Sequence, residues 1–154
     1  MRRFASGIIV AAALILSVGC EPQDGRPGLW LRGEPSAIPA DWSFSRDHKE
    51  IAVQVGTPYL LPHSVTVWCI DVDGNLYLGA SRPEAKNWPG WVRHDPDVRV
   101  KIDTKLYDVT LEELLDADVI RQVGLAYAEK YDLDEPLSPD PAAVRYWLVT
   151  PSAG

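Results

Sequence analysis

The sequence has few of the residues from which metal sites are built. It contains two cysteines and three histidines in 154 residues. The histidines lie far apart, at His48, His63 and His94, and neither a His-x-x-x-His nor a Cys-x-x-Cys spacing occurs. The sequence therefore predicts that the protein has no metal site.

Basic residues are also in short supply. The chain has 15 Lys and Arg against 22 Asp and Glu, which gives a formal net charge of −7. Because the binding of nucleic-acid phosphates needs a basic face, this balance argues against nucleic acid as a partner. The Gly-x-Ser-x-Gly elbow, the P-loop and the Gly-x-Gly-x-x-Gly loop are missing as well. No side chain stands out as a catalytic acid or base.

Long apolar runs are missing too, and the apolar stretch over residues 8–18 is too short for a typical transmembrane helix. It follows Arg2 and Arg3, as in an export signal, and the arginine pair leaves the twin-arginine route open. Residues 16–20, Leu-Ser-Val-Gly-Cys, resemble a bacterial lipobox. The resemblance implies that residues 1–19 are removed and that Cys20 is lipidated. An ordinary secretory signal is the alternative.

A lipid on Cys20 would anchor the protein to the bacterial cell envelope, facing the periplasm. Glu21 follows the cysteine, so nothing resembles an inner-membrane retention signal, and the outer membrane is favoured over the inner. Cys69 would then have no partner within the chain, and it lies in an apolar run. We expect Cys69 to be a buried thiol.

Composition divides the remaining chain into two parts. Residues 20–40 contain four prolines and three glycines, which is typical of an extended tether. Within this tether, Leu29–Leu31 would form one short edge strand. Residues 41–154 are predicted to form one folded domain, since the length suits a single small domain.

Alternating and β-branched runs predict that this domain is mainly β. Strands are expected at residues 50–55, 64–70, 76–80, 97–102 and 143–150, with a hairpin turn at residues 71–75. Residues 105–114 alternate and favour a strand, although Thr110–Glu113 also fits a capping box. A helix is expected from the N-cap Asp116 to Tyr131, where apolar residues recur at helical spacing.

The stretch from Ser64 to Ile102 resembles the FMN-binding split-barrel superfamily of pyridoxamine-phosphate-oxidase-like proteins and deazaflavin-dependent nitroreductases. The residues behind the resemblance are the Val-Thr-Val strand at 65–67, Gly-Ala-Ser-Arg at 79–82, Lys-Asn-Trp-Pro at 86–89 and the segment 92–100. The resemblance implies an α+β fold, mainly β with one or two helices, of the split β-barrel class.

The resemblance also implies a flavin site after the second hairpin strand. It assigns seven residues to the binding of FMN: Thr66, Val67, Gly79, Ser81, Arg82, Lys86 and Trp88. Thr66 and Val67 would line the flavin ring, and Ser81, Arg82 and Lys86 would hold the phosphate. Gly79 would let the backbone approach the ligand, and Trp88 would cover the ring. The alternatives are a solvated loop for the basic residues and a core or dimer-interface role for the tryptophan.

Two hypotheses for the function follow. The first is a homodimeric, FMN-dependent oxidoreductase in which the cofactor performs the hydride chemistry. The second is a flavin-free split barrel that serves as a ligand-binding or structural module of the envelope. Pro62–Ser64 replaces an Arg-Pro pair of the family and Pro83 interrupts its phosphate-binding run, which keeps the second hypothesis open. The sequence identifies neither substrate nor electron donor, and it does not distinguish FMN from a deazaflavin.

Overall fold

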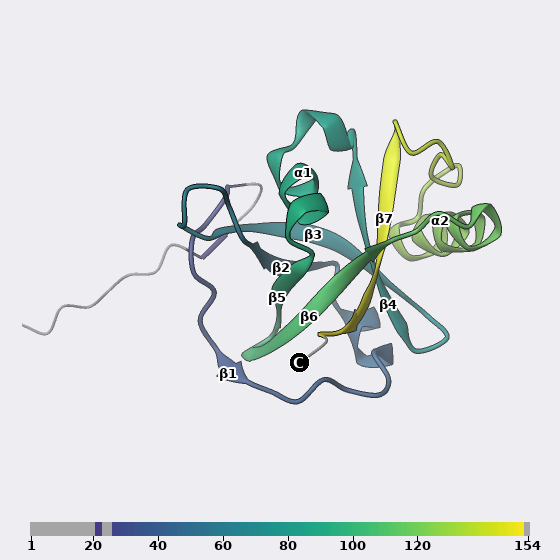
Figure 1. The fold of residues 1–154 in the computed structure, drawn as a ribbon. Helices are drawn as coiled ribbons and strands as arrows, with labels where there is room; N and C mark the ends of the chain where they lie inside the picture. Colours follow the sequence, from purple (N-terminus) through teal and green to yellow (C-terminus); the bar gives the residue numbers. More distant parts are fainter. Residues whose placement is uncertain (1–20, 23–25, 153–154) are drawn as a thin grey trace, which may run out of the picture.

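A computed structural model of the protein describes residues 21–22 and 26–152, and six antiparallel strands in it close into a barrel (Figure 1). The strands are β2 (Glu50–Val55), β3 (His63–Val72), β4 (Asn75–Ser81), β5 (Asp97–Ile102), β6 (Lys105–Glu113) and β7 (Val144–Pro151). They lie in the order β5-β2-β3-β4-β7-β6, and the pairing of β6 with β5 closes the ring. The predicted split β-barrel class is confirmed.

The alternation of apolar residues builds the barrel wall. Val53 and Val55 on β2 and Val98 and Val100 on β5 point inward and are buried, while their sequence neighbours face outward. A two-residue turn joins β3 to β4, and both of its residues, Asp73 and Gly74, have positive φ. Such a turn matches the twist of the flanking strands. Residues 105–113 form the strand β6, as their alternation predicted, and not the helix that the capping box would have begun.

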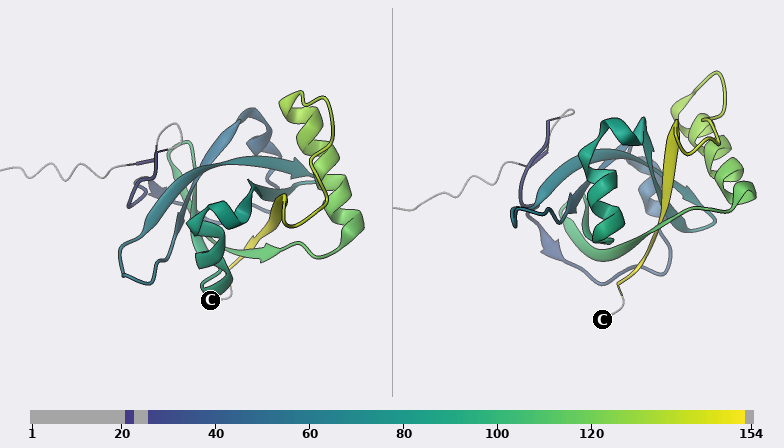
Figure 2. Two further views of the ribbon diagram at one scale, coloured as in Figure 1. Left: turned by 90° about the horizontal axis from the view of Figure 1, so that it is seen from above. Right: turned by 45° about the horizontal axis from the view of Figure 1, so that its top comes forward.

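Two helices occupy different places relative to the barrel (Figure 2). α1 (Asn87–His94) covers one end of the barrel and sends Trp88 and Val92 into the core. α2 (Ala117–Tyr131) lies outside and forms a second apolar cluster with the outer faces of β3, β4 and β7. Asp116 caps α2 as predicted, since its side chain accepts from the amides of residues 118 and 119.

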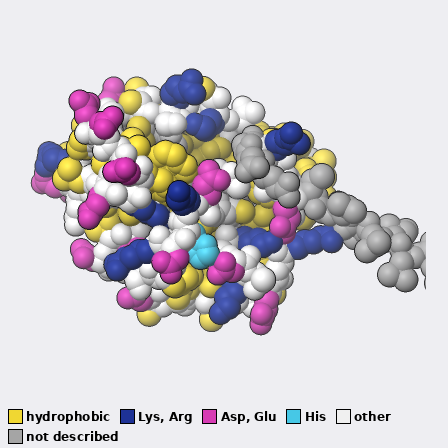
Figure 3. Space-filling model, turned by 180° about the vertical axis from the view of Figure 1, so that it is seen from behind, with side chains coloured by type: hydrophobic (Ala, Val, Ile, Leu, Met, Phe, Trp, Pro, Cys, Tyr) yellow, Lys and Arg dark blue, Asp and Glu magenta, His cyan; other side chains and the backbone are white. Residues whose placement is uncertain are grey.

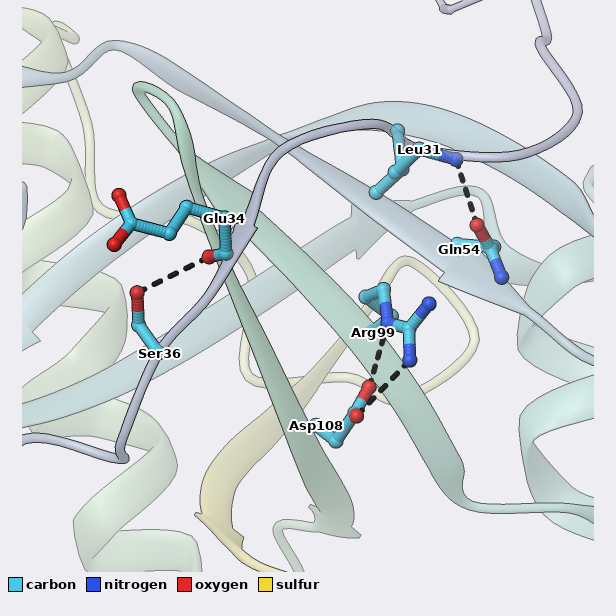
Figure 4. Close-up of polar contacts among 6 residues, drawn as sticks. All are labelled: Leu31, Glu34, Ser36, Gln54, Arg99 and Asp108. Atoms are coloured by element: carbon cyan, nitrogen blue, oxygen red, sulfur yellow. Dashed lines mark hydrogen bonds and ion pairs between the residues drawn. The ribbon is translucent and has the colours of Figure 1, made fainter. Parts of the chain in front are cut away.

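The proline-rich segment before the barrel runs along the outside of β2, β3 and β6. Gly28 exchanges two backbone hydrogen bonds with Ser64, and the Leu31 amide donates to Gln54 Oε1 at 2.7 Å (Figure 4). Leu31 itself is buried. The short strand expected at residues 29–31 forms instead at β1 (Glu34–Pro35), which pairs in parallel with β6. The described part of the predicted tether therefore packs on the barrel.

The contacts of this segment extend back to Glu21. Lys101 Nζ on β5 lies 2.6 and 2.7 Å from the two carboxylate oxygens of Glu21, and the Arg32 amide donates to the same carboxylate at 3.0 Å. Burial raises the pKa of Glu21, but these hydrogen bonds lower it, and the net pKa lies below its usual value. The predicted signal peptide and Cys20 lie outside the described residues.

The apolar interior is drawn from the barrel domain and from Leu31. Its buried hydrophobic residues run from Leu31 to Val149 along the sequence, and Pro22 and Gly28 of the preceding segment are buried as well. Cys69 is fully buried within it, as expected. No helix in the described part of the chain is both long enough and apolar enough to span a membrane.

Candidate functional site

The hairpin strands β3 and β4 separate at one end, and a cavity opens there. They pair only from Val72 and Asn75 to Cys69 and Leu78. β3 nevertheless begins at His63, and β4 continues to Ser81. The cavity has a volume of about 260 Å³ and is lined by residues 66–68 of β3 and 79–81 of β4. Residues 66–67 and residues 79 and 81, which were predicted to bind FMN, thus meet where β3 and β4 separate.

Tyr127 of α2 marks the point at which the strands diverge. Its hydroxyl donates to Trp68 O at 2.9 Å and lies 3.2 Å from Tyr77 O. Burial raises the pKa of Tyr127 well above its usual value, so this hydroxyl stays protonated. A Cβ at Gly79 would lie 3.2 Å from the Tyr127 oxygen. The glycine thus makes room for Tyr127, and it also lines the cavity in which the sequence predicted a ligand.

Six of the seven residues predicted to bind FMN line this cavity: Thr66, Val67, Gly79, Ser81, Lys86 and Trp88. Strands β3 and β4 supply the first four, and Lys86 precedes α1 directly. The remaining lining residues, which the sequence did not suggest, are Glu50, Trp68, Ala80, Tyr127, Leu137 and Val144. Leu137 comes from the loop after α2, and no local pattern connects that loop with the hairpin.

The two basic residues predicted to hold the phosphate lie in different places, because Lys86 lines the cavity and Arg82 does not. Lys86 Nζ donates to the carbonyl oxygen of Ser81 and lies 3.4 Å from the Ser81 hydroxyl. Burial, with a smaller contribution from the nearby Arg82 charge, lowers the pKa of Lys86. Arg82 is not among the lining residues. It adopts a left-handed conformation, with φ +47°, at the start of a short 3-10 helix (Pro83–Ala85), and it is exposed.

A second cavity of about 400 Å³ adjoins the first and shares Thr66, Lys86 and Trp88 with it. Arg26 and His63 also line it, and neither was predicted. Burial lowers the pKa of His63, which favours the neutral imidazole. Arg26 lies in the segment that composition assigned to a tether, so the sequence did not suggest it as a site residue.

The tryptophans belong mainly to the packing of the barrel. Trp88 is buried and tilted against Trp147, with 4.9 Å between the ring centroids, so it contributes to the cavity wall from within the core. Trp68 is 41% exposed and stacks on Tyr131 at 4.3 Å. The core alternative thus applies to Trp88, while Trp68 presents an aromatic surface beside the cavity.

The cavity combines a polar end with apolar walls. Lys86 and Ser81 offer a cation and a hydroxyl, which suit an anionic group. Val67, Ala80 and Val144 supply apolar surface of the kind that packs against a planar ring. Glu50 adds one carboxylate to the lining. No group of three or more His, Cys, Asp or Glu side chains that could hold a metal is found among the described residues.

Charged side chains of both signs are mixed on one face of the molecule (Figure 3). On the face seen from behind, Lys and Arg side chains are interspersed with Asp and Glu side chains (Figure 3). This face offers no continuous basic surface in the described part of the chain. The cavity itself is lined by one cationic side chain, Lys86, and one carboxylate, Glu50, in a chain whose net charge is negative.

Comparison with known proteins identifies a family by sequence. The model of the family DUF2255, described as "Uncharacterized protein conserved in bacteria", matches residues 46–142. No curated protein matches the chain. The matched residues extend from the segment before β2 to the loop after α2, so they include most of the barrel and every residue that lines the 260 Å³ cavity except Val144.

Solved structures share the fold at low sequence identity. A proposed 5-nitroimidazole antibiotic resistance protein from Bacteroides thetaiotaomicron has a TM-score of 0.54 and 16% identity, over 79% of this chain and 86% of that one. An F420 reductase has a TM-score of 0.52 and 17% identity, over 75% and 97%. A Clostridium acetobutylicum protein of the pyridoxinephosphate oxidase family has a TM-score of 0.52 and 15% identity, over 71% and 79%. These likenesses establish the split-barrel fold.

Proposed function

We propose that this chain, which belongs to the DUF2255 family, is a split-barrel oxidoreductase that binds FMN where β3 and β4 separate. One observation supports the proposal most strongly. Six residues chosen for FMN on sequence resemblance, from three separate segments, line a single cavity. Distant structural kinship to an F420 reductase and to the pyridoxinephosphate oxidase family points to the same class of cofactor.

The residues of the cavity suit such a cofactor. Lys86 and the Ser81 hydroxyl would hold the phosphate by charge-assisted hydrogen bonds. Thr66 and Val67 would line the ring, and Trp68 would add an aromatic surface beside it. FMN supplies the hydride chemistry when bound, and the protein binds the cofactor and orients it. Arg82 contributes at most a long-range charge, because it lies off the cavity.

Titration with FMN and riboflavin tests the proposal, using Lys86→Ala and Arg82→Ala as a matched pair. Each charge-assisted hydrogen bond contributes about 1.5–3 kcal/mol. Loss of Lys86 should therefore weaken FMN binding by roughly tenfold to a hundredfold. Riboflavin has no phosphate, so its binding should hardly change. Arg82→Ala should have a clearly smaller effect on FMN than Lys86→Ala, and flavin fluorescence measures the six affinities of the wild type and the two variants for both ligands.

The second candidate is a flavin-free binding or structural module of the envelope. It is favoured by the volume of the cavity between β3 and β4, which at about 260 Å³ lies just below the range of about 300–1,000 Å³ that is common for ligand pockets. The Glu50 carboxylate in the lining also opposes an anionic ligand. If the wild-type protein binds no FMN at about 100 μM, which corresponds to about −5 to −6 kcal/mol, the flavoprotein proposal fails and this candidate remains.

We place the protein in the bacterial envelope, anchored by a lipid on Cys20 and facing the periplasm, and we propose that it forms a homodimer. The lipobox-like residues 16–20 support the anchor. Cys20→Ser should move the protein from the membrane fraction to the soluble periplasmic fraction, and unchanged membrane association would contradict the anchor. Light scattering on the domain of residues 41–154 tests the dimer, and a monomer at micromolar concentration would contradict it.

A further inference from the structure

We infer that one side of the barrel rests on the membrane surface. This side comprises residues 29–30 of the N-terminal segment, which covers part of β2 and β5, and the loop of residues 56–62, with Leu60 and Leu61 entering the lipid. The inference goes beyond the proposed flavin chemistry and rests on the proposed anchor at Cys20 only for the attachment. Three observations support it: the chain next to Cys20 is attached to β5, exposed apolar side chains gather on the same side, and the attachment and these side chains share one face of the sheet.

The first observation is that the chain next to Cys20 is fixed to the barrel. Glu21 pairs with Lys101 on the outer face of β5, and its carboxylate also accepts from the Arg32 amide. Consecutive Cα atoms are 3.8 Å apart, so a lipid on the residue before Glu21 would have almost no free chain between itself and the residue that pairs with β5. A lipid on Cys20 would therefore leave the protein at the barrel surface, and the bilayer would be brought close to β5.

The second observation is a concentration of exposed apolar side chains on the same side. The hydrogen bonds between Gly28 and Ser64 bring residues 29–30 beside the β2–β3 loop, and Figure 1 shows these two segments next to each other. Together they expose five large apolar side chains: Leu29, Trp30, Tyr59, Leu60 and Leu61. Leu60 is 94% exposed and has a positive φ of 64°. Among the described residues, the four other large exposed apolar side chains lie outside these two segments: Phe44, Trp68, Leu115 and Leu125.

The anchor point and the apolar cluster share one face of the sheet. Trp30, Leu60 and Leu61 line a groove of about 500 Å³ together with Gln54 of β2 and Arg99 of β5. Arg99 and Lys101 are two residues apart on β5, so their side chains point to the same face. A lipid attached beside Lys101 and a leucine pair beside Arg99 can therefore meet one flat bilayer surface.

The chemistry of the cluster suits a lipid boundary. Tryptophan and tyrosine favour the interface between water and lipid because each has an apolar body and a polar end, and leucine favours the acyl region. Asp95 and Asp97 also line the groove, so attraction to anionic headgroups is not expected to contribute. The contact should depend on apolar burial and should occur on uncharged phosphatidylcholine vesicles.

The test couples the mature chain, residues 20–154, to phosphatidylcholine vesicles through a maleimide lipid at the Cys20 sulfur. The described core lies within this chain, and Cys69 is buried and protected from the reagent. The vesicles contain brominated phosphatidylcholine, which quenches tryptophan fluorescence at the membrane. Trp30 and Trp68 form a matched pair, with exposures of 49% and 41%. Trp30→Phe should remove most of the quenching, and Trp68→Phe should leave it unchanged.

A second pair of variants tests the leucines directly. The double variant Leu60→Asp and Leu61→Asp should reduce quenching of Trp30 several-fold, whereas Leu115→Asp, which changes an exposed leucine outside the cluster, should not. Absent quenching, or equal quenching after Trp30→Phe and Trp68→Phe, would overturn the inference. Because the chemical coupling replaces cellular lipidation, a failure of the anchor proposal would appear only in the Cys20→Ser fractionation, and a failure of flavin binding only in the FMN titration.

Discussion

The two outer faces of the barrel are covered in different ways. On β3, β4 and β7, helix α2 buries Ile120, Val123 and Tyr127 in a continuous apolar cluster with Ile70 and Tyr146. On the other side of the barrel, an extended segment buries Leu31 and is otherwise held by backbone hydrogen bonds to Ser64, Thr104 and Leu106 and by the ion pair of Glu21 with Lys101. The first cover is built like a core, and the second is mainly a polar attachment.

The difference predicts different energetics for the two covers. Apolar burial contributes about 25 cal/mol per Å², so a packed helix is expected to unfold together with the barrel. A single hydrogen bond or a partly exposed ion pair contributes far less to the free energy of unfolding than a packed helix does. Segments held only by such contacts open locally. Helix α2 should thus be part of the global stability, while the N-terminal segment should be able to detach while the barrel stays folded.

Loss of Tyr127 should be the most damaging change on the α2 side. Tyr127→Ala removes a side chain that is 1% exposed and should lower the free energy of unfolding by about 3–5 kcal/mol. Tyr127→Phe keeps the ring and leaves Trp68 O without its hydrogen bond, so it should cost about 1–3 kcal/mol. Urea unfolding measures both values. A cost below about 1 kcal/mol for Tyr127→Ala would mean that α2 is not part of the core.

Truncation of Leu31 should have an intermediate effect on the opposite side. Leu31 is buried, but its segment covers the barrel from one side only, so Leu31→Ala should cost about 2 kcal/mol, at the low end for a buried leucine. The partly exposed Leu29 is the matched control, and Leu29→Ala should change stability by no more than about 0.5 kcal/mol. Equal, small effects of the two variants would contradict the packing of Leu31 on the barrel.

The comparison also explains which parts of the fold could be predicted. β2 and β5 have the predicted bounds, and α2 begins after the predicted N-cap Asp116, because these elements are encoded by local periodicity and capping. The N-terminal segment shows the opposite. Glu21 and Lys101 are 80 positions apart, and a proline-rich composition describes local stiffness but not what the chain packs against.

The part of the candidate site that lies on the hairpin strands β3 and β4 could be predicted from the sequence. Thr66 and Ser81 came from the family resemblance, and the separation of β3 from β4 brings them to one cavity. Gly79 lines the cavity as predicted, but its contact with Tyr127 could not be predicted, since that contact depends on how α2 packs. Arg82 lies off the cavity because its backbone turns into the left-handed region, which a charge pattern does not indicate. The contribution of Arg26 depended on the path of the whole N-terminal segment.

The ion pair of Glu21 should have the smallest effect on stability and a clear local effect. Glu21 and Lys101 are partly exposed, so Glu21→Ala should cost about 0.2–1 kcal/mol. The Arg32 amide donates to the Glu21 carboxylate, so its protection from hydrogen exchange should fall in the same variant. Glu21→Gln is the matched control, because the amide oxygen can still accept from Arg32 while the charge is lost.

Acidification offers the same test without a mutation. The pKa of Glu21 is lowered from its ordinary value of 4.5, so the folded protein holds the carboxylate ionised more readily than the unfolded chain does. The contribution of Glu21 is therefore fully present above pH 4.5 and is lost as the pH falls through the lowered pKa. The exchange protection of the Arg32 amide, corrected for the intrinsic rate, should decrease in this acidic range in the wild-type protein. In Glu21→Gln it should not change with pH, and a parallel decrease in both proteins would show that Glu21 does not hold the segment on the barrel.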